Sequence, residues 1–110
     1  MDYEFIRANL DALDPQPTLL ASGAATGADR LAMAWAKIEG VQIVGFPVYK
    51  AQWQKTGKGA GPIRNGLMLD MVQPDLVVAF PGNTGTADCV RQAKRRGITV
   101  QYADPKPQPK

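Results

Sequence analysis

Apolar residues recur along the chain at two spacings, one typical of helices and one typical of short buried strands. From Tyr3 to Leu13 the apolar positions follow the helical spacing, and Asp14-Pro15 closes the segment. The same spacing predicts three more helices, at about Ala28 to Glu39, Gly61 to Val72 and Thr86 to Arg96. Short apolar runs predict four strands, at Thr18 to Ala21, Val41 to Phe46, Asp75 to Phe80 and Ile98 to Tyr102.

Helices that alternate with short strands favour an α/β fold, a Rossmann-like, doubly wound, mostly parallel sheet flanked by helices. The run Asp75 to Phe80 has the apolar composition of a parallel strand buried on both faces. The chain has 110 residues, which corresponds to one domain, at residues 1–103. The tail 104–110 alternates proline with polar residues and is predicted to be disordered.

One feature conflicts with this fold class, because doubly wound domains normally begin with a central strand. Here no apolar run precedes the helix at Tyr3, so the usual N-terminal central strand is missing. Three explanations stay open. The strands Thr18 to Ala21 and Asp75 to Phe80 pair directly, another chain fills the gap, or the natural reading frame begins further upstream.

Two glycine-containing turns follow predicted strands, and each leads into a helix. They are Ser22-Gly23-Ala24-Ala25-Thr26-Gly27 and Pro81-Gly82-Asn83-Thr84-Gly85-Thr86. Glycines let a backbone approach a ligand closely, and a helix N-terminus presents unpaired N–H groups and a positive dipole end. Since strand C-termini share one edge of such a sheet, the two turns are predicted to build one pocket for a phosphate or carboxylate.

Arg64 is predicted to lie beside these turns, at the start of a helix, where a cation is unfavourable to the dipole and calls for an anionic partner. The alternative is a surface ion pair with an acid such as Asp70. The irregular connection from Pro47 to Gly59 adds Trp53, which either stacks on a nucleobase or packs as a lid, and Lys58, which either reaches a phosphate or is solvated.

Other residues of the turns have structural alternatives. Thr26 and Thr86 fit helix caps whether or not they also contact a ligand, and Asp29 suits the first turn of its helix as a dipole partner. Cys89 is expected to be a buried small residue rather than a nucleophile of lowered pKa.

Composition narrows the function classes. The chain has no histidine, which excludes His-based general bases and the common zinc sites, so neither a metal nor a cofactor is expected. One cysteine cannot form an internal disulfide, and no apolar stretch has the length of about 20 residues that spans a bilayer. We therefore expect a cytoplasmic protein without a membrane partner.

The net charge is a modest +3. A basic cluster stands near the end of the last predicted helix and consists of Arg91, Lys94, Arg95 and Arg96. It is interpreted first as a solvated helix end, which the dipole favours, and second as a weakly supported nucleic-acid patch.

Three segments, SGAATGADRLAMAWA, WQKTGKGAGPIRNGLM and DLVVAFPGNTGTAD, resemble the YspA cpYpsA-related SLOG family over nearly all of Asp2 to Val100. The family is part of a superfamily that includes DprA-type DNA-processing proteins and the cytokinin-activating LOG enzymes. Members of the superfamily have a Rossmann-like fold and are thought to bind nucleotides or nucleotide-derived ligands, and many YspA-type members are encoded by bacteria and their phages or mobile elements. The resemblance implies ligand contacts from Gly23, Gly27, Arg64, Asn65, Gly82, Gly85 and Thr86.

The chain departs from the LOG signature at two positions. Asn83 replaces the second glycine, and Cys89 stands where those enzymes carry the glutamate that assists cleavage of the N-glycosidic bond. A thiol cannot replace a carboxylate in that role. Asp88 is adjacent, but one residue along a helix turns a side chain by about 100°. The family's usual first strand, ending in a Gly-Gly-Arg type motif, is also missing.

Three functions follow from these observations. The first is a binding or sensor module for a nucleotide-derived ligand, with no catalysis or only weak catalysis. The second is a nucleoside monophosphate phosphoribohydrolase, in which Arg64 holds the phosphate and Asp88 is the acid-base group. The third is a DprA-like DNA-associated protein, and a homo-oligomer is a further expectation because it would cover an open sheet edge.

Overall fold

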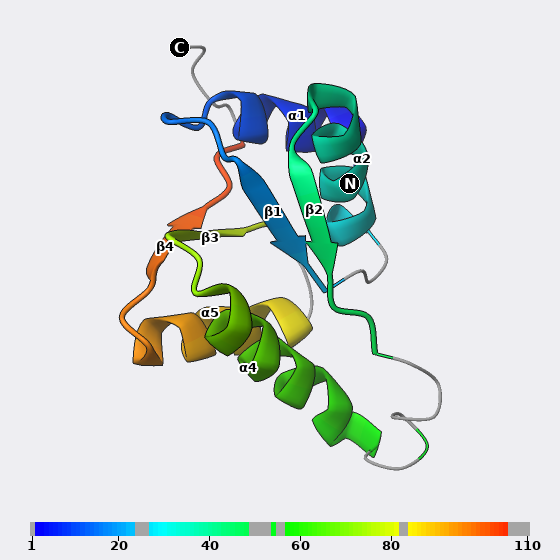
Figure 1. Ribbon diagram of the computed structural model, residues 1–110, viewed down its shortest axis with the longest axis vertical. Helices are drawn as coiled ribbons and strands as arrows, with labels where there is room; N and C mark the ends of the chain where they lie inside the picture. Colours follow the sequence, from blue (N-terminus) through cyan, green and yellow to red (C-terminus); the bar gives the residue numbers. More distant parts are fainter. Residues whose placement is uncertain (1, 24–26, 49–53, 55–56, 82–83, 106–110) are drawn as a thin grey trace.

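The computed structural model describes residues 2–23, 27–48, 54, 57–81 and 84–105. In chain order, its elements are α1 (Tyr3–Asp11), β1 (Leu19–Ser22), α2 (Ala28–Glu39), β2 (Gln42–Gly45), the 3₁₀ helix η1 (Gly57–Gly59), α4 (Ala60–Val72), β3 (Leu76–Ala79), α5 (Thr84–Arg95) and β4 (Thr99–Tyr102). The predicted alternation of helices and strands is confirmed, and most predicted boundaries agree within two residues (Figure 1).

Local signals explain where several helices begin and end. The Asp2 carboxylate accepts a hydrogen bond of 2.9 Å from the Phe5 N–H and caps α1. Gly40 ends α2 in the left-handed conformation, with φ of 73°, and Gly97 follows α5 with the same φ.

The strands form two separate parallel pairs. β1 pairs with β2 from Leu19↔Gln42 to Ser22↔Gly45, and β3 pairs with β4 from Leu76↔Thr99 to Ala79↔Tyr102. The Rossmann-like α/β class with parallel strands is therefore confirmed. Direct pairing of β1 with β3 is not observed. Within the described residues, each pair of strands forms its own two-stranded sheet.

The core lies between α1, α2 and both strand pairs. Ile6 and Leu10 of α1 and Trp35 of α2 are at most 3% exposed. Partly buried side chains from three strands and the segment after β3 pack against them, namely Leu20, Ile43, Leu76, Val78 and Phe80. The ring of Phe5 meets that of Phe80 edge to face, with centroids 5.9 Å apart. Helix α1 thus contacts both strand pairs.

Burial of β3 is lower than the sequence predicts. Leu76, Val77 and Val78 are only partly buried, and Ala79 alone in this strand is buried. The expectation of a strand covered on both faces is wrong, because a two-stranded sheet leaves β3 with one paired neighbour.

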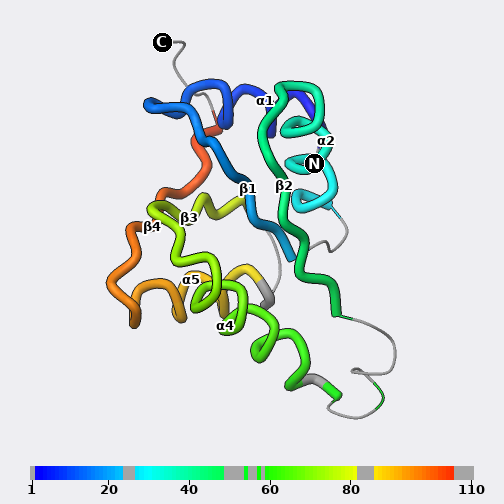
Figure 2. The backbone as a smooth tube through the Cα atoms, in the orientation of Figure 1, coloured from blue at the N-terminus to red at the C-terminus, as the bar shows by residue number. Residues whose placement is uncertain are grey.

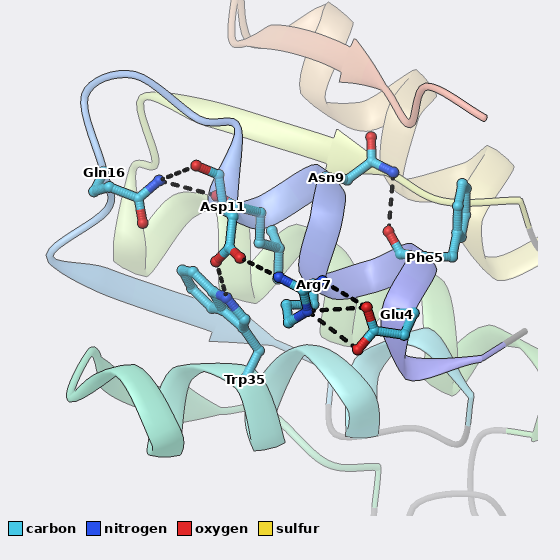
Figure 3. A network of polar contacts seen from close by, with 8 residues as sticks. Glu4, Phe5, Arg7, Asn9, Asp11, Gln16 and Trp35 are labelled. Carbon is cyan, nitrogen blue, oxygen red and sulfur yellow. Dashed lines mark hydrogen bonds and ion pairs between the residues drawn. The ribbon is translucent and has the colours of Figure 1, made fainter. Parts of the chain in front are cut away.

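A polar network joins α1 to α2 (Figure 3). The indole N–H of Trp35 donates to Oδ1 of Asp11 over 2.9 Å, while Arg7 donates to Oδ2 of Asp11 over the same distance. Arg7 also pairs with Glu4. The buried Trp35 ring therefore has its single donor satisfied at the rim of the core.

Asn9 anchors the chain after β4 to α1. Its Nδ2 donates to the carbonyl oxygens of Phe5 and Asp104, each over 3.0 Å, and its Oδ1 accepts from the Asp104 N–H over 2.8 Å. Asn9 is 3% exposed. The predicted disorder of the tail stays a prediction, since 106–110 lie outside the described residues.

Candidate functional site

The carboxyl ends of β1 and β2 lie next to α4. The β1–β2 ladder continues one residue past the strands, since the Phe46 N–H donates to the Ser22 carbonyl over 2.8 Å. Figure 2 shows α4 and α5 side by side beyond this end of β1. This is the sheet edge at which ligands bind in open α/β folds.

Arg64 connects α4 to that edge. Its Nη1 donates to the carbonyl oxygen of Gly23 over 2.6 Å and to that of Phe46 over 3.1 Å. Among the described residues, no acid forms an ion pair with Arg64, and its Nη2 has no hydrogen-bond partner. The guanidinium therefore lies at the predicted sheet edge, and within the described residues its charge is not paired with a carboxylate and its Nη2 has no acceptor.

The alternative pairing of Arg64 with Asp70 is wrong. Asp70 instead accepts from Nε of Arg96 over 2.7 Å, which ties the outer face of α4 to the end of α5.

Gly23 is the residue that makes room for this guanidinium. A Cβ built on Gly23 would lie 2.6 Å from Nη1 and 2.7 Å from Cζ of Arg64, closer than any real Cβ contact. Gly23 is buried, and so is Ser22 before it. The predicted proximity of this turn to Arg64 is thus present in the fold.

Behind Arg64, a buried polar network links α4 to α5. Oδ1 of Asn65 accepts from Nε of Arg64 over 2.8 Å, and Nδ2 of Asn65 donates to Oδ2 of Asp88 over 3.0 Å. Gln92 donates to the same Asp88 oxygen over 2.7 Å and to the Pro62 carbonyl over 2.9 Å. Asn65, Asp88 and Gln92 are each less than 9% exposed.

Asp88 is held in its ionised form. Burial by itself raises the pKa of the carboxyl, but the hydrogen bonds from Asn65 and Gln92 and the charge of Arg91 outweigh this, so the pKa lies below its ordinary value. Arg91 donates to Oδ1 over 2.7 Å. Both carboxylate oxygens of Asp88 therefore have donors.

The pKa of the Cys89 thiol is shifted in the opposite direction, above its ordinary value. Burial raises the pKa of its thiol, the carboxylates of Asp88 and Asp29 raise it further, and the opposing effects of Arg64 and Arg96 are smaller. The expectation that Cys89 is not a nucleophile of lowered pKa agrees with this direction. The expectation that it is buried is wrong, because its residue surface is only partly covered. Because Asp29 and Arg64 act on the same thiol, charges from α2, α4 and α5 converge here.

The remaining predicted site residues differ in placement. Asp29 lies in the first turn of α2 as predicted, but the N-cap position is held by Gly27, not Thr26. Thr86 is not a cap either, because α5 begins two residues earlier, at Thr84. Pro81 is exposed after β3. Four predicted site residues lie outside the described residues: Thr26, Trp53, Gly82 and Asn83. For Lys58, Thr84 and Gly85 the structure describes the backbone only.

Sequence reasoning missed a hollow of about 420 Å³ between α5 and the ends of β3 and β4. Phe80, Thr86, Val90 and Tyr102 help to line it. Two residues along a helix turn a side chain by about 200°, so Thr86 faces away from Asp88 and the hollow is separate from the Arg64 network. Its sequence signals are the aromatic residues Phe80 and Tyr102 at the ends of the two strands, and the predicted site residues Pro81 and Thr86 line this hollow.

The basic cluster of α5 is largely engaged within the molecule. Arg91 pairs with Asp88, Arg96 pairs with Asp70, and Nζ of Lys94 lies 5.6 Å from the Tyr102 ring centroid. In the part of the chain that the structure describes, no helix is long and apolar enough to cross a membrane.

Comparison with known proteins identifies the family of this chain. The profile of the YspA, cpYpsA-related SLOG family matches residues 1–55. The "Gene 61 protein" of Mycobacterium phage D29 is 37% identical over 101 residues, which cover 84% of this chain and 77% of the phage protein. No solved structure matches the chain with statistical significance. The profile spans half of the chain and the phage protein most of it, so this protein belongs to the YspA, cpYpsA-related SLOG family.

Proposed function

We propose that this protein binds a nucleotide or nucleotide-derived ligand whose anionic group lies against Arg64 at the carboxyl ends of β1 and β2. The main observation behind this proposal is the set of contacts that the Arg64 guanidinium makes. The guanidinium donates to the Gly23 and Phe46 carbonyls, and among the described residues it has no ion-pair partner and no acceptor at Nη2, which suits it to bind an anion.

The surroundings support an anionic ligand. The N-terminus of α2 follows the Gly23 turn, and that of α5 follows β3, so each of these strand-to-helix connections leads to the positive end of a helix dipole. Membership in a SLOG family supports a nucleotide-derived ligand over a simple anion.

Binding without hydrolysis is the form of this proposal that the site favours. A phosphoribohydrolase would need Asp88 to exchange a proton. Three donors and a lowered pKa keep this carboxylate ionised, and Cys89 stands where LOG enzymes carry glutamate. DNA binding has less support, because Arg91 and Arg96 are neutralised by Asp88 and Asp70.

A ligand screen tests the proposal. Thermal unfolding is followed with AMP, ADP-ribose, NAD and inorganic phosphate, for the wild type and for Arg64→Gln. A ligand at a hundredfold excess over Kd stabilises the wild type by about 2.7 kcal/mol, and Arg64→Gln loses most of that gain. No response of the wild type to any compound, or an equal response of Arg64→Gln, contradicts the proposal. Free base released from AMP would instead establish hydrolysis.

A further inference from the structure

Asn65 connects two charged groups that come from different helices. Its amide oxygen accepts from Nε of Arg64 over 2.8 Å, and its amide nitrogen donates to Oδ2 of Asp88 over 3.0 Å. Arg64 and Asn65 are neighbours on α4, whereas Asp88 comes from α5. One amide therefore bridges a cation and an anion that do not hydrogen-bond to each other.

The chemistry of the two partners fixes the orientation of the Asn65 amide. An ionised carboxylate only accepts hydrogen bonds and a guanidinium only donates them, so the NH₂ group must face Asp88 and the oxygen must face Arg64. Asp88 is itself fixed by Gln92 over 2.7 Å and by Arg91 over 2.7 Å. No buried polar side-chain atom among the described residues lacks a partner.

Two nitrogens of the Arg64 guanidinium are held by hydrogen bonds. Nε is bound by Asn65, and Nη1 is bound by the carbonyls of Gly23 and Phe46. A planar group held at two of its three nitrogens cannot rotate about its long axis, so the direction in which Nη2 points is set. A pre-oriented donor binds an anion without first losing rotamer entropy.

We propose that Asn65 and Asp88 are positioning residues: Asp88 orients the Asn65 amide, and Asn65 orients the Arg64 guanidinium toward the anionic ligand. This inference rests on the proposed function for its ligand but not for its geometry. It assigns Asp88 a role as a hydrogen-bond acceptor, not as an acid-base group.

The acceptor role separates two substitutions at Asp88. In Asp88→Asn, the amide oxygen still accepts from Asn65 and Gln92, while its nitrogen displaces only Arg91, whose side chain is 62% exposed and free to turn to solvent. Asp88→Leu removes the acceptor altogether. The positioning role therefore survives the first substitution and is lost in the second.

The first experiment needs no ligand. Exchange of the Arg64 Nε–H with solvent is measured by ¹⁵N NMR of the side-chain signal. We expect protection in the wild type and Asp88→Asn, and exchange faster by about tenfold or more in Asn65→Leu and Asp88→Leu. If Asn65→Leu does not fold, Asn65→Ser is used, because a serine is too short to bridge Arg64 and Asp88. Unchanged protection in the Asn65 variant overturns the proposal.

Gln92→Met is the matched control. Like Asn65→Leu, it replaces a buried amide by an apolar side chain and removes one donor from Oδ2 of Asp88, but it leaves the bond between Asn65 and Arg64 in place. Both variants should lose thermal stability. Only the Asn65 variant should lose Nε–H protection, and equal loss in Gln92→Met would reduce the role of Asn65 to general stability and overturn the proposal.

The second experiment measures binding of inorganic phosphate and AMP by the same variants. We expect Asn65→Leu and Asp88→Leu to weaken binding by about tenfold, and Asp88→Asn and Gln92→Met to stay within about twofold of the wild type. Loss of Nε–H protection with unchanged affinity overturns the positioning role alone. A wild type that binds neither compound nor any other nucleotide, with protection intact, overturns the proposed function and this role with it.

Discussion

The α-carbon of Gly23 lies against the guanidinium of Arg64 so closely that a Cβ on Gly23 would be 2.6 Å from Nη1. Gly23 has no left-handed φ, so alanine would meet no backbone strain there, and the obstacle is the guanidinium. We expect Gly23→Ala to displace Arg64 and to weaken binding of the anionic ligand by at least about tenfold. Calorimetric titration with AMP measures this effect.

The control is the same substitution in an Arg64→Ala background. With the guanidinium removed, the alanine at position 23 has room, and the two changes together should bind no more weakly than Arg64→Ala alone. Additive losses would show that Gly23 acts on the ligand by some route other than Arg64.

Stability should depend on pH through Asp88. Its folded-state pKa is lower than that of the unfolded chain, so the carboxylate contributes its full stability above its ordinary pKa of 3.8 and loses it as the pH falls through the lower folded value. Asp88→Asn should cost about 1 to 3 kcal/mol in the free energy of unfolding at pH 7. The difference from the wild type should shrink below about pH 4. Urea unfolding at several pH values tests this, and a constant difference from pH 7 to pH 3 would contradict it.

The sequence predicts the helices better than it predicts the sheet, because helix signals are local. The predicted bounds of α2, Ala28 to Glu39, equal the observed ones, since a continuous apolar stripe is ended by Gly40. Pairing of strands is decided between distant segments. The two separate strand pairs and the half-buried β3 follow from tertiary packing on α1, which no local pattern encodes.

The candidate site also has one part that the sequence predicts and one part that it does not. Strand, turn and helix order suffices to bring the Gly23 turn near Arg64, because parallel strands end at one edge. The identity of the Arg64 partners does not follow from the sequence, since backbone carbonyls leave no signature. The bridge from Asn65 to Asp88 needs α4 and α5 in contact, and the sequence alone does not set the rotation of one helix against the other.

Trp35 is expected to be the largest single contributor to the core. Its side chain is fully buried, and its indole N–H is bound by Asp11. Trp35→Ala should lower the free energy of unfolding by about 3 to 5 kcal/mol. Asp11→Asn retains an oxygen acceptor for the indole and should cost less than about 1 kcal/mol. Denaturant unfolding compares the two variants, and similar losses in both would mean that the charge of Asp11, which also binds Arg7, matters as much as burial of the ring.

Asn9 should stabilise the chain end after β4. Asn9→Leu keeps a similar volume but removes both hydrogen bonds between Asn9 and the backbone of Asp104, so we expect a loss of about 1 to 3 kcal/mol. Hydrogen exchange at the Asp104 amide should also become faster. Gln16, in the loop after α1, provides a control: its amide donates to backbone carbonyls at the end of α1 and not to Asp104, so Gln16→Leu should leave the Asp104 exchange rate unchanged.

The thiol of Cys89 should react slowly. Burial and the carboxylates of Asp88 and Asp29 raise its pKa, so less thiolate is present at neutral pH than for an ordinary cysteine. Iodoacetamide should alkylate the folded protein at least about tenfold more slowly than the chain unfolded in guanidinium. The rate should rise in Asp88→Asn, which removes the stronger of the two carboxylate effects. A folded protein that reacts as fast as the unfolded chain at pH 7 would show a thiolate stabilised by Arg64, and would restore Cys89 as a candidate nucleophile.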